Sequence, residues 1–169
     1  IGHDSHQCDI LNFVDKITEI DNILTEANKR NLTLFGKICI IKTLALSKII
    51  FVATCLHIPD NVIKIINQKI FRFLWGNRDR IKRKSIISKI QHGGLNMIDL
   101  QTQLTAIKAA WANRIVRASD EEMWAHLPKS YILRFGKDFL LFKMTFTTNK
   151  EFPWISALPP FYQDVILGY

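Results

Sequence analysis

The chain has 169 residues, of which 48% are hydrophobic and 22% charged, and its formal net charge is +8. This composition excludes a disordered, collagen-like or low-complexity protein, and the length fits one domain with or without an appended subdomain. The three cysteines, Cys8, Cys39 and Cys55, are widely spaced and odd in number, which favours reduced thiols in an intracellular protein.

The first predicted helix runs from about Asp9 to Lys29. Apolar side chains recur there every three or four residues and form one stripe, as on a helix with one buried face. The Asp9 side chain is suited to accept hydrogen bonds from the first turn, so we expect it to be the N-cap.

The second predicted helix begins at Thr33, as N-cap, and continues to about Thr54. Apolar residues cover most of its circumference, which is typical of a central helix. The stretch also contains Lys42 and Lys48, and a lysine near the centre of a bilayer costs roughly 2.5–3.5 kcal/mol. We therefore expect a buried core helix and no membrane partner.

Two further helices are predicted, at about Asn61–Trp75 and about Leu100–Arg117. The first should end at Gly76 and expose a polar face. Between the two helices, a Gly93-Gly94 turn favours a short β-hairpin or an extended basic segment around residues 78–98. A short amphipathic segment around Tyr131–Phe142 and an aromatic, proline-containing tail are expected after it.

The net charge is concentrated in one part of the chain. Nine basic residues and one acidic residue, Asp79, lie between Asn61 and Ile98, and the remaining residues contain equal numbers of basic and acidic side chains. A solvated surface is the usual interpretation of a charge run. Because the whole excess falls in one window, we favour a polyanionic partner, although a membrane surface or an import receptor would attract the same run.

Residue patterns of the common enzyme classes are missing. The sequence has no adjacent aspartate pair for metal-dependent phosphoryl transfer, no P-loop and no nucleophile elbow. His3, His6 and Cys8 have no obvious fourth zinc ligand, and the same holds for Cys55 with His57. We therefore expect no catalytic residue, no metal site and no cofactor in this chain.

Three ordered blocks resemble reverse transcriptases of LINE-type non-LTR retrotransposons. The block at 29–50 reads KRNLTLFGKICIIKTLALSKII and is similar to the segment that follows the palm in that family. The blocks KIFRFLWGN at 69–77 and HGGLNMIDL at 92–100 resemble two downstream segments. Many members have Pro at the position of Ser47 and Trp at that of Ala27.

The resemblance implies that the chain is the thumb and the connecting region after it, cut from a longer protein. The fingers and the palm, with the catalytic aspartates and the divalent metal ions, would then lie upstream. In this family the thumb is a helical bundle that grips the template–primer duplex. We accordingly expect RNA and DNA as partners, together with the upstream domains, and a location in the cytoplasm and nucleus.

The predicted fold is a mainly α bundle in three segments. Residues 1–76 form the thumb-like bundle, residues 77–119 the basic connector with its Gly-Gly turn and following helix, and residues 120–169 an aromatic C-terminal segment.

The expected function is non-catalytic binding of the template–primer duplex, through contacts to phosphate that do not depend on base sequence. The alternative is a structural module that packs on the palm and binds no nucleic acid, because an isolated thumb should expose apolar surface. Lys37 is the weaker of the predicted contacts, since its neighbours on the helix are apolar. The predicted contacts are Lys29, Arg30, Lys37, Lys48, Arg78, Arg80, Lys82, Arg83 and Lys84.

Overall fold

The computed structural model describes residues 5–76, 81–133 and 153–168. These residues are mainly helical and include no β-strand, so the predicted mainly α class is confirmed. The helices are α1 (Ser5–Asn28), α2 (Leu34–Ile40), the π-helical turn η1 (Ile41–Ala45), α3 (Ser47–Cys55), α4 (Asp60–Trp75), α5 (Arg83–Ile87), the 3-10 turn η2 (Ile90–His92), α6 (Leu100–Arg117), α7 (Met123–Leu133), the 3-10 turn η5 (Pro153–Ala157) and α8 (Pro160–Leu167).

The chain divides into two compact units. The bundle unit comprises Ile1–Ala53 and Ile58–Thr102, and the C-terminal unit comprises Thr54–His57 and Gln103–Tyr169. The division falls inside α6, whereas the segments expected from the sequence divide at 76/77 and 119/120. The basic stretch therefore belongs to the same compact unit as the first four helices.

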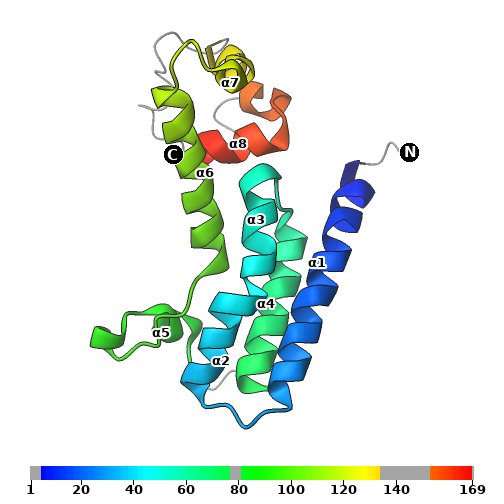
Figure 1. Ribbon diagram of the computed structural model, residues 1–169, viewed down its shortest axis with the longest axis vertical. Helices are drawn as coiled ribbons and strands as arrows, with labels where there is room; N and C mark the ends of the chain where they lie inside the picture. The colour runs from blue at the N-terminus through cyan, green and yellow to red at the C-terminus, as the bar shows by residue number, and fades with distance from the viewer. Residues whose placement is uncertain (1–4, 77–80, 134–152, 169) are drawn as a thin grey trace. The chain divides into compact units, whose positions relative to one another are not determined.

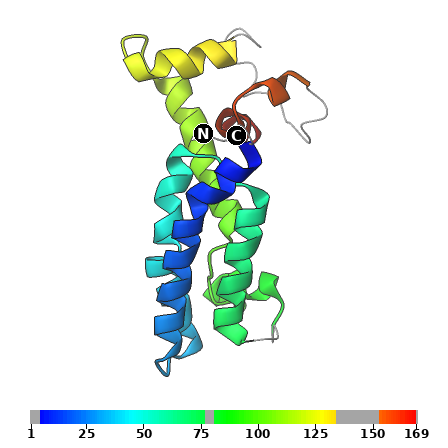
Figure 2. The ribbon, with the colours of Figure 1, turned by 90° about the vertical axis from the view of Figure 1, so that its right-hand side faces the viewer.

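In the bundle unit, α1, α4 and the continuous α2–η1–α3 helix lie side by side (Figures 1 and 2). Helix α1 packs against α4 and η1, and α2 packs against α4. Helix α1 begins at Ser5, so Asp9 lies inside the helix and the predicted N-cap is wrong. The fully buried large side chains of these helices are Phe13, Ile20, Ile41, Leu46, Ile49, Ile66 and Ile70.

Helix α4 matches its sequence prediction closely. Its polar face, which includes Asn61, Lys64 and Arg72, is exposed, and the opposite face is buried. The helix ends at Gly76, where φ is +77°, a value that L-residues with a Cβ rarely adopt. Its buried residues are Val62, Ile63, Ile66, Ile70, Phe71, Phe73 and Leu74.

The second predicted helix is present but is not buried on all sides. The Thr33 hydroxyl accepts the Gly36 N–H at 3.2 Å, which confirms the predicted N-cap. Phe35, Leu44 and Phe51 are 58%, 50% and 76% exposed, so the expectation of a central helix is wrong for this face. One side of the helix packs on α1 and α4, and apolar residues of the other side are exposed.

By length and composition alone, the Leu34–Cys55 stretch is one that could cross a membrane. Its most apolar window has a mean hydropathy of 2.0, and 33% of that window is buried inside the protein. The core helix of a soluble protein meets the same two criteria, so this is weak evidence for a membrane span.

The described part of the 78–98 segment forms α5 and η2 and contains no strand, so the predicted hairpin is not confirmed. Backbone hydrogen bonds nevertheless fold the segment back on itself. The Leu95 and Met97 N–H groups donate to the Ile86 carbonyl at 3.1 and 3.2 Å, and the Asn96 N–H donates to the Ser88 carbonyl at 2.9 Å. Gly94 lies so close to Ser88 that an added Cβ would sit 2.0 Å from the Ser88 carbonyl oxygen.

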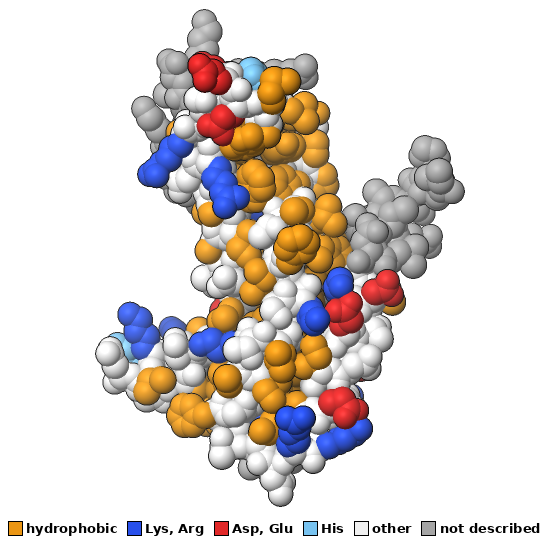
Figure 3. Space-filling view, in the orientation of Figure 1, with side chains coloured by type: hydrophobic (Ala, Val, Ile, Leu, Met, Phe, Trp, Pro, Cys, Tyr) orange, Lys and Arg blue, Asp and Glu red, His pale blue; other side chains and the backbone are white. Residues whose placement is uncertain are grey.

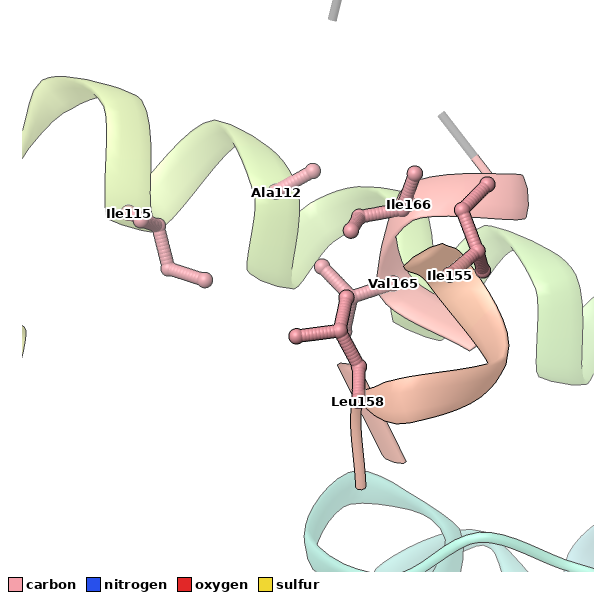
Figure 4. Close-up of a cluster of buried hydrophobic side chains, with 6 residues drawn as sticks. All are labelled: Ala112, Ile115, Ile155, Leu158, Val165 and Ile166. Atoms are coloured by element: carbon pink, nitrogen blue, oxygen red, sulfur yellow. The ribbon is translucent and has the colours of Figure 1, made fainter. Parts of the chain in front are cut away.

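The C-terminal unit has its own core, formed by α6, η5 and α8 (Figure 4). Helix α6 has the bounds that the sequence predicts. Of the amphipathic segment predicted at 131–142, α7 covers residues up to Leu133, and the rest lies outside the described residues. The core side chains are Ala112, Ile115, Ile155, Leu158, Val165 and Ile166.

Polar side chains fasten the short 54–57 stretch into this unit. The Trp111 indole N–H donates to the Thr54 carbonyl at 2.6 Å, and the Lys108 ammonium donates to the Leu56 carbonyl at 2.8 Å. His57 Nδ1 lies 2.6 Å from an Asp164 carboxylate oxygen. The first two bonds supply donors to carbonyl groups at and just after the end of α3, where no further helical turn provides N–H donors.

Lys108 is only 4% exposed, and its ammonium lies 3.9 Å from the centroid of the Phe161 ring. Burial lowers the pKa of Lys108 to about 8, because the charged form loses its hydration. The nearby Asp164 carboxylate acts in the opposite direction, but its effect on this pKa is smaller.

The close approach at Gly94 predicts that Gly94→Ala destabilises the bundle unit, because the added methyl group would overlap the Ser88 backbone. We expect a loss of about 2 kcal/mol or more in the free energy of unfolding, measured in urea. Gly93→Asn is the matched control. Gly93 has φ +75° with open space around it, and Asn tolerates that conformation. Equal stability of Gly94→Ala and the wild type would contradict the prediction.

The lowered pKa of Lys108 predicts a pH-dependent stability. Between pH 8 and 10.5 the unfolded chain retains the Lys108 proton more than the folded chain does, so the free energy of unfolding rises with pH across this window. We expect Lys108 to contribute a rise of about 1–3 kcal/mol. The measurement compares urea unfolding of the wild type and Lys108→Met from pH 7.5 to 10. Parallel pH profiles of the two proteins would refute it.

Candidate nucleic-acid interface

The basic window lies on the surface of the bundle unit. Seven of its nine basic residues are described, and all are exposed except Lys69, which is partly buried. Arg78 and Arg80 lie outside the described residues. Lys69 reaches across to Asp21 of α1, with its ammonium 2.7 Å from the carboxylate. The described members are Lys64, Lys69, Arg72, Lys82, Arg83, Lys84 and Lys89.

Three of the predicted contacts, Lys82, Arg83 and Lys84, are consecutive at the start of α5. All three are exposed, and basic side chains gather over this part of the surface at the lower left of Figure 3. The Arg83 guanidinium lies 4.1 Å from the centroid of the Phe71 ring, a cation–π contact that ties α5 to α4. We name these residues the α5 cluster.

The α5 cluster stands on a folded support. Ile86 and Met97 are 1% and 4% exposed, and backbone hydrogen bonds join their segments. The Lys42 ammonium of the second helix donates to the Asn96 carbonyl at 3.2 Å, which attaches the segment to the bundle. The backbone that carries the α5 cluster is therefore ordered by the fold before any partner arrives, which reduces the entropy lost on binding.

The other predicted contacts differ in how free their charges are. Lys29 and Arg30 follow the end of α1, and Lys29 pairs with Glu26 at 2.6 Å. The Lys48 ammonium lies 3.7 Å from Glu19, whose other carboxylate oxygen is 2.6 Å from Lys16. The hydrogen bond from Lys16 is the largest cause of the lowered pKa of Glu19. Lys48 thus shares a carboxylate, whereas the Arg30 side chain makes no ion pair in the described structure.

Lys37 has a structural role in addition to any contact with a partner. Its ammonium donates to the carbonyl oxygens of Phe73 and Leu74 at 2.9 and 3.5 Å and lies 5.2 Å from the centroid of the Phe73 ring. These carbonyls belong to the last turn of α4, which has no intrahelical donors for them. This geometry agrees with the alternative for Lys37, a lysine on a packed helix surface.

A groove that sequence reasoning missed lies beside Lys37, at the end of the bundle where α1 turns into α2 and where α4 ends. Three adjoining pockets of about 380, 310 and 330 Å³ form it, and all three are lined by Asn28. Arg72 and Lys37 each line two of the three. The sequence indicated only the excess of positive charge around Arg72. The groove itself is formed by the packing of α4 against α1 and α2.

Among the described residues, no group of three or more His, Cys, Asp or Glu side chains is placed to hold a metal ion. Two of the residues weighed as zinc ligands, His6 and Cys8, have no described side chains, and His3 lies outside the described residues. The expectation that this chain holds no metal and no catalytic residue stays a prediction.

Three comparisons bear on identity. The chain matches no protein-family model, no curated protein and no solved structure. The functional interpretation therefore depends on the residues and on their arrangement in the bundle unit.

Proposed function

We propose that the chain is a non-catalytic nucleic-acid-binding fragment of a retrotransposon reverse transcriptase, which grips the template–primer duplex. The observation that carries the proposal is the concentration of the whole net charge of +8 in one window of the sequence. The described basic residues of that window lie on one compact unit, and most are exposed.

The physical basis is neutralisation of phosphate charge. Each basic side chain that approaches a phosphate releases condensed counterions, which favours binding irrespective of base sequence. The α5 cluster supplies three adjacent charges on an ordered support, and Arg83 keeps its guanidinium on the Phe71 ring. Lys29 and Arg30, after α1, would extend the contact, and Arg78 and Arg80 precede the α5 cluster in the sequence.

The three blocks quoted from the sequence support the finer part of the proposal. In this proposal residues 1–76 are the thumb, and residues 77–119, which include α5 and α6, are the basic connector with its following helix. The catalytic aspartates and their divalent metal ions belong to the upstream palm, so this chain supplies grip and no chemistry. The partners are an RNA- and DNA-containing duplex and the upstream domains, in the cytoplasm and nucleus.

The second candidate is a structural module that packs on the palm without binding nucleic acid. It is favoured by the exposed apolar residues Phe35, Leu44 and Phe51 of the second helix. Hydrophobic side chains are visible along this part of the surface in Figure 3. An apolar face of this kind is typical of a surface that another domain covers.

Charge reversal in the α5 cluster separates the two candidates. With Lys82→Glu, Arg83→Glu and Lys84→Glu combined, we expect the affinity for an RNA–DNA hybrid to fall by about tenfold or more, because three phosphate contacts become repulsive. Fluorescence anisotropy across salt concentrations measures this. The slope of log affinity against log salt should decrease in magnitude by about 2–3, at about 0.9 per phosphate contact.

Two controls accompany this experiment. The combination Lys82→Arg, Arg83→Lys and Lys84→Arg keeps the charge and should keep the salt slope. Arg114→Glu with Arg117→Glu changes exposed charges of α6, outside the window, and should leave most of the affinity. Unchanged hybrid binding by the charge-reversed protein, with an unaltered thermal melt, would exclude the α5 cluster as a contact and favour the packing module.

A further inference from the structure

The groove at the end of the bundle unit gathers hydrogen-bond donors that the fold leaves unused. Arg72 and Arg30 line it, and within the described part of the chain neither side chain makes a hydrogen bond or an ion pair. The same is true of the side-chain amides of Asn28 and Asn31. Such a set of donors suits a ligand rich in acceptor oxygens.

One further donor is buried in the groove wall. The indole nitrogen of Trp75, a residue that lines the largest of the three pockets, has no hydrogen-bond partner among the described residues. A buried donor without a partner costs about 1–3 kcal/mol. Because Trp75 also lines this pocket, its indole N–H resonance is placed to report a ligand that binds there.

The charge balance of the groove favours an anion. Its basic residues are Arg30, Lys37, Lys69 and Arg72, and its one acidic residue, Asp21, is already paired with Lys69 at 2.7 Å. Three positive charges therefore remain without a carboxylate. Arginine guanidinium groups match the geometry of a phosphate, which they bind through two parallel hydrogen bonds.

The C-terminal end of α4 opens into the same groove and by itself would repel an anion, because helix C-termini carry partial negative charge. Lys37 removes this obstacle. Its ammonium donates to the Phe73 and Leu74 carbonyl oxygens, and it keeps a third hydrogen for a ligand. Its charge also offsets the end of the helix.

Apolar side chains form the rest of the wall. Leu32, Leu34 and Trp75 are partly buried and line the pocket that also contains Arg72. A ligand that fits this wall has an anionic group next to a flat apolar part. The pocket volumes, about 310–380 Å³ each, lie at the lower end of those found for small-molecule sites.

We propose that this groove binds a single unpaired nucleotide, with its phosphate at Arg72 and Lys37 and its base against Leu32, Leu34 and Trp75, residues that line one pocket. This assignment deepens the proposed function and rests on it for the source of the nucleotide, a strand that leaves the duplex. A free nucleotide offers the same chemistry. The groove does not include the α5 cluster, so the two binding sites can be altered separately.

The test follows the indole N–H resonance of Trp75 by NMR, assigned with Trp75→Phe, during titration of the 169-residue chain. The probes are adenosine 5′-monophosphate, adenosine, inorganic phosphate and a single-stranded RNA octamer. We expect the monophosphate and the octamer to shift this resonance. Adenosine and phosphate should bind about tenfold more weakly, because each lacks one of the two recognised parts.

Arg72→Gln should lower the affinity for adenosine 5′-monophosphate by about tenfold, which is the effect of losing one charge-assisted hydrogen bond. Lys64→Gln is the matched control, because Lys64 is exposed on the same helix two turns earlier and lines none of the three pockets. It should bind as the wild type does. A Trp75 resonance unmoved by the monophosphate, equal binding of inorganic phosphate, or unchanged binding by Arg72→Gln would each overturn the proposal.

The octamer arm identifies the source of the nucleotide. Tighter binding of the octamer than of the monophosphate assigns a strand, and the reverse order overturns that part of the proposal in favour of a free nucleotide. The charge-reversed α5 cluster should retain the Trp75 shift while it loses the hybrid. Failure of the unaltered chain to bind the hybrid therefore counts against the proposed duplex grip, and a Trp75 resonance that no nucleotide shifts counts against the groove.

Discussion

Burial of one face of α4 is the constraint on which the bundle unit depends. Seven side chains of this helix are buried, and full burial of each large apolar one contributes about 1.5–3 kcal/mol. Helices α1 and α2 both pack on it. The same helix carries Phe71, which holds Arg83, and its last carbonyl groups hold Lys37. The position of the α5 cluster and the shape of the groove therefore both follow from α4.

Lysine side chains in this protein do two kinds of work. Lys37, Lys42 and Lys108 each donate to a backbone carbonyl that is distant in sequence, and so join segments of the fold. Exposed residues such as Lys82 and Lys84 have no such role in the described structure, and their charges face solvent. A count of charged residues in the sequence does not distinguish lysines bonded to a carbonyl from exposed ones. Burial and hydrogen bonding separate them, because a bonded ammonium would have to leave its carbonyl in order to reach a phosphate fully.

The helices and their faces could be predicted from the sequence to a large extent. The bounds of α4 and α6, the Thr33 cap and the exposed polar face of α4 follow from local periodicity and capping chemistry. The exposure of one side of the second helix could not be predicted, because the identity of an apolar residue does not tell whether another part of the protein covers it. The hairpin that the sequence suggested around Gly93-Gly94 is not confirmed, for a related reason. The turn forms, but its flanking residues bond to Ile86 and Ser88 across a short helix.

The sequence by itself determined the helical class and the concentration of charge between Asn61 and Ile98, because each depends on residues that are close along the chain. Only the tertiary structure decided which charges are free. It placed Arg72 in one pocket with Asn28 and Lys37, residues at least 35 positions away, and it enclosed Lys108 in the C-terminal unit. Such groups are brought together by the packing of whole helices. The separation of two residues along the sequence does not give the distance between them in the folded protein.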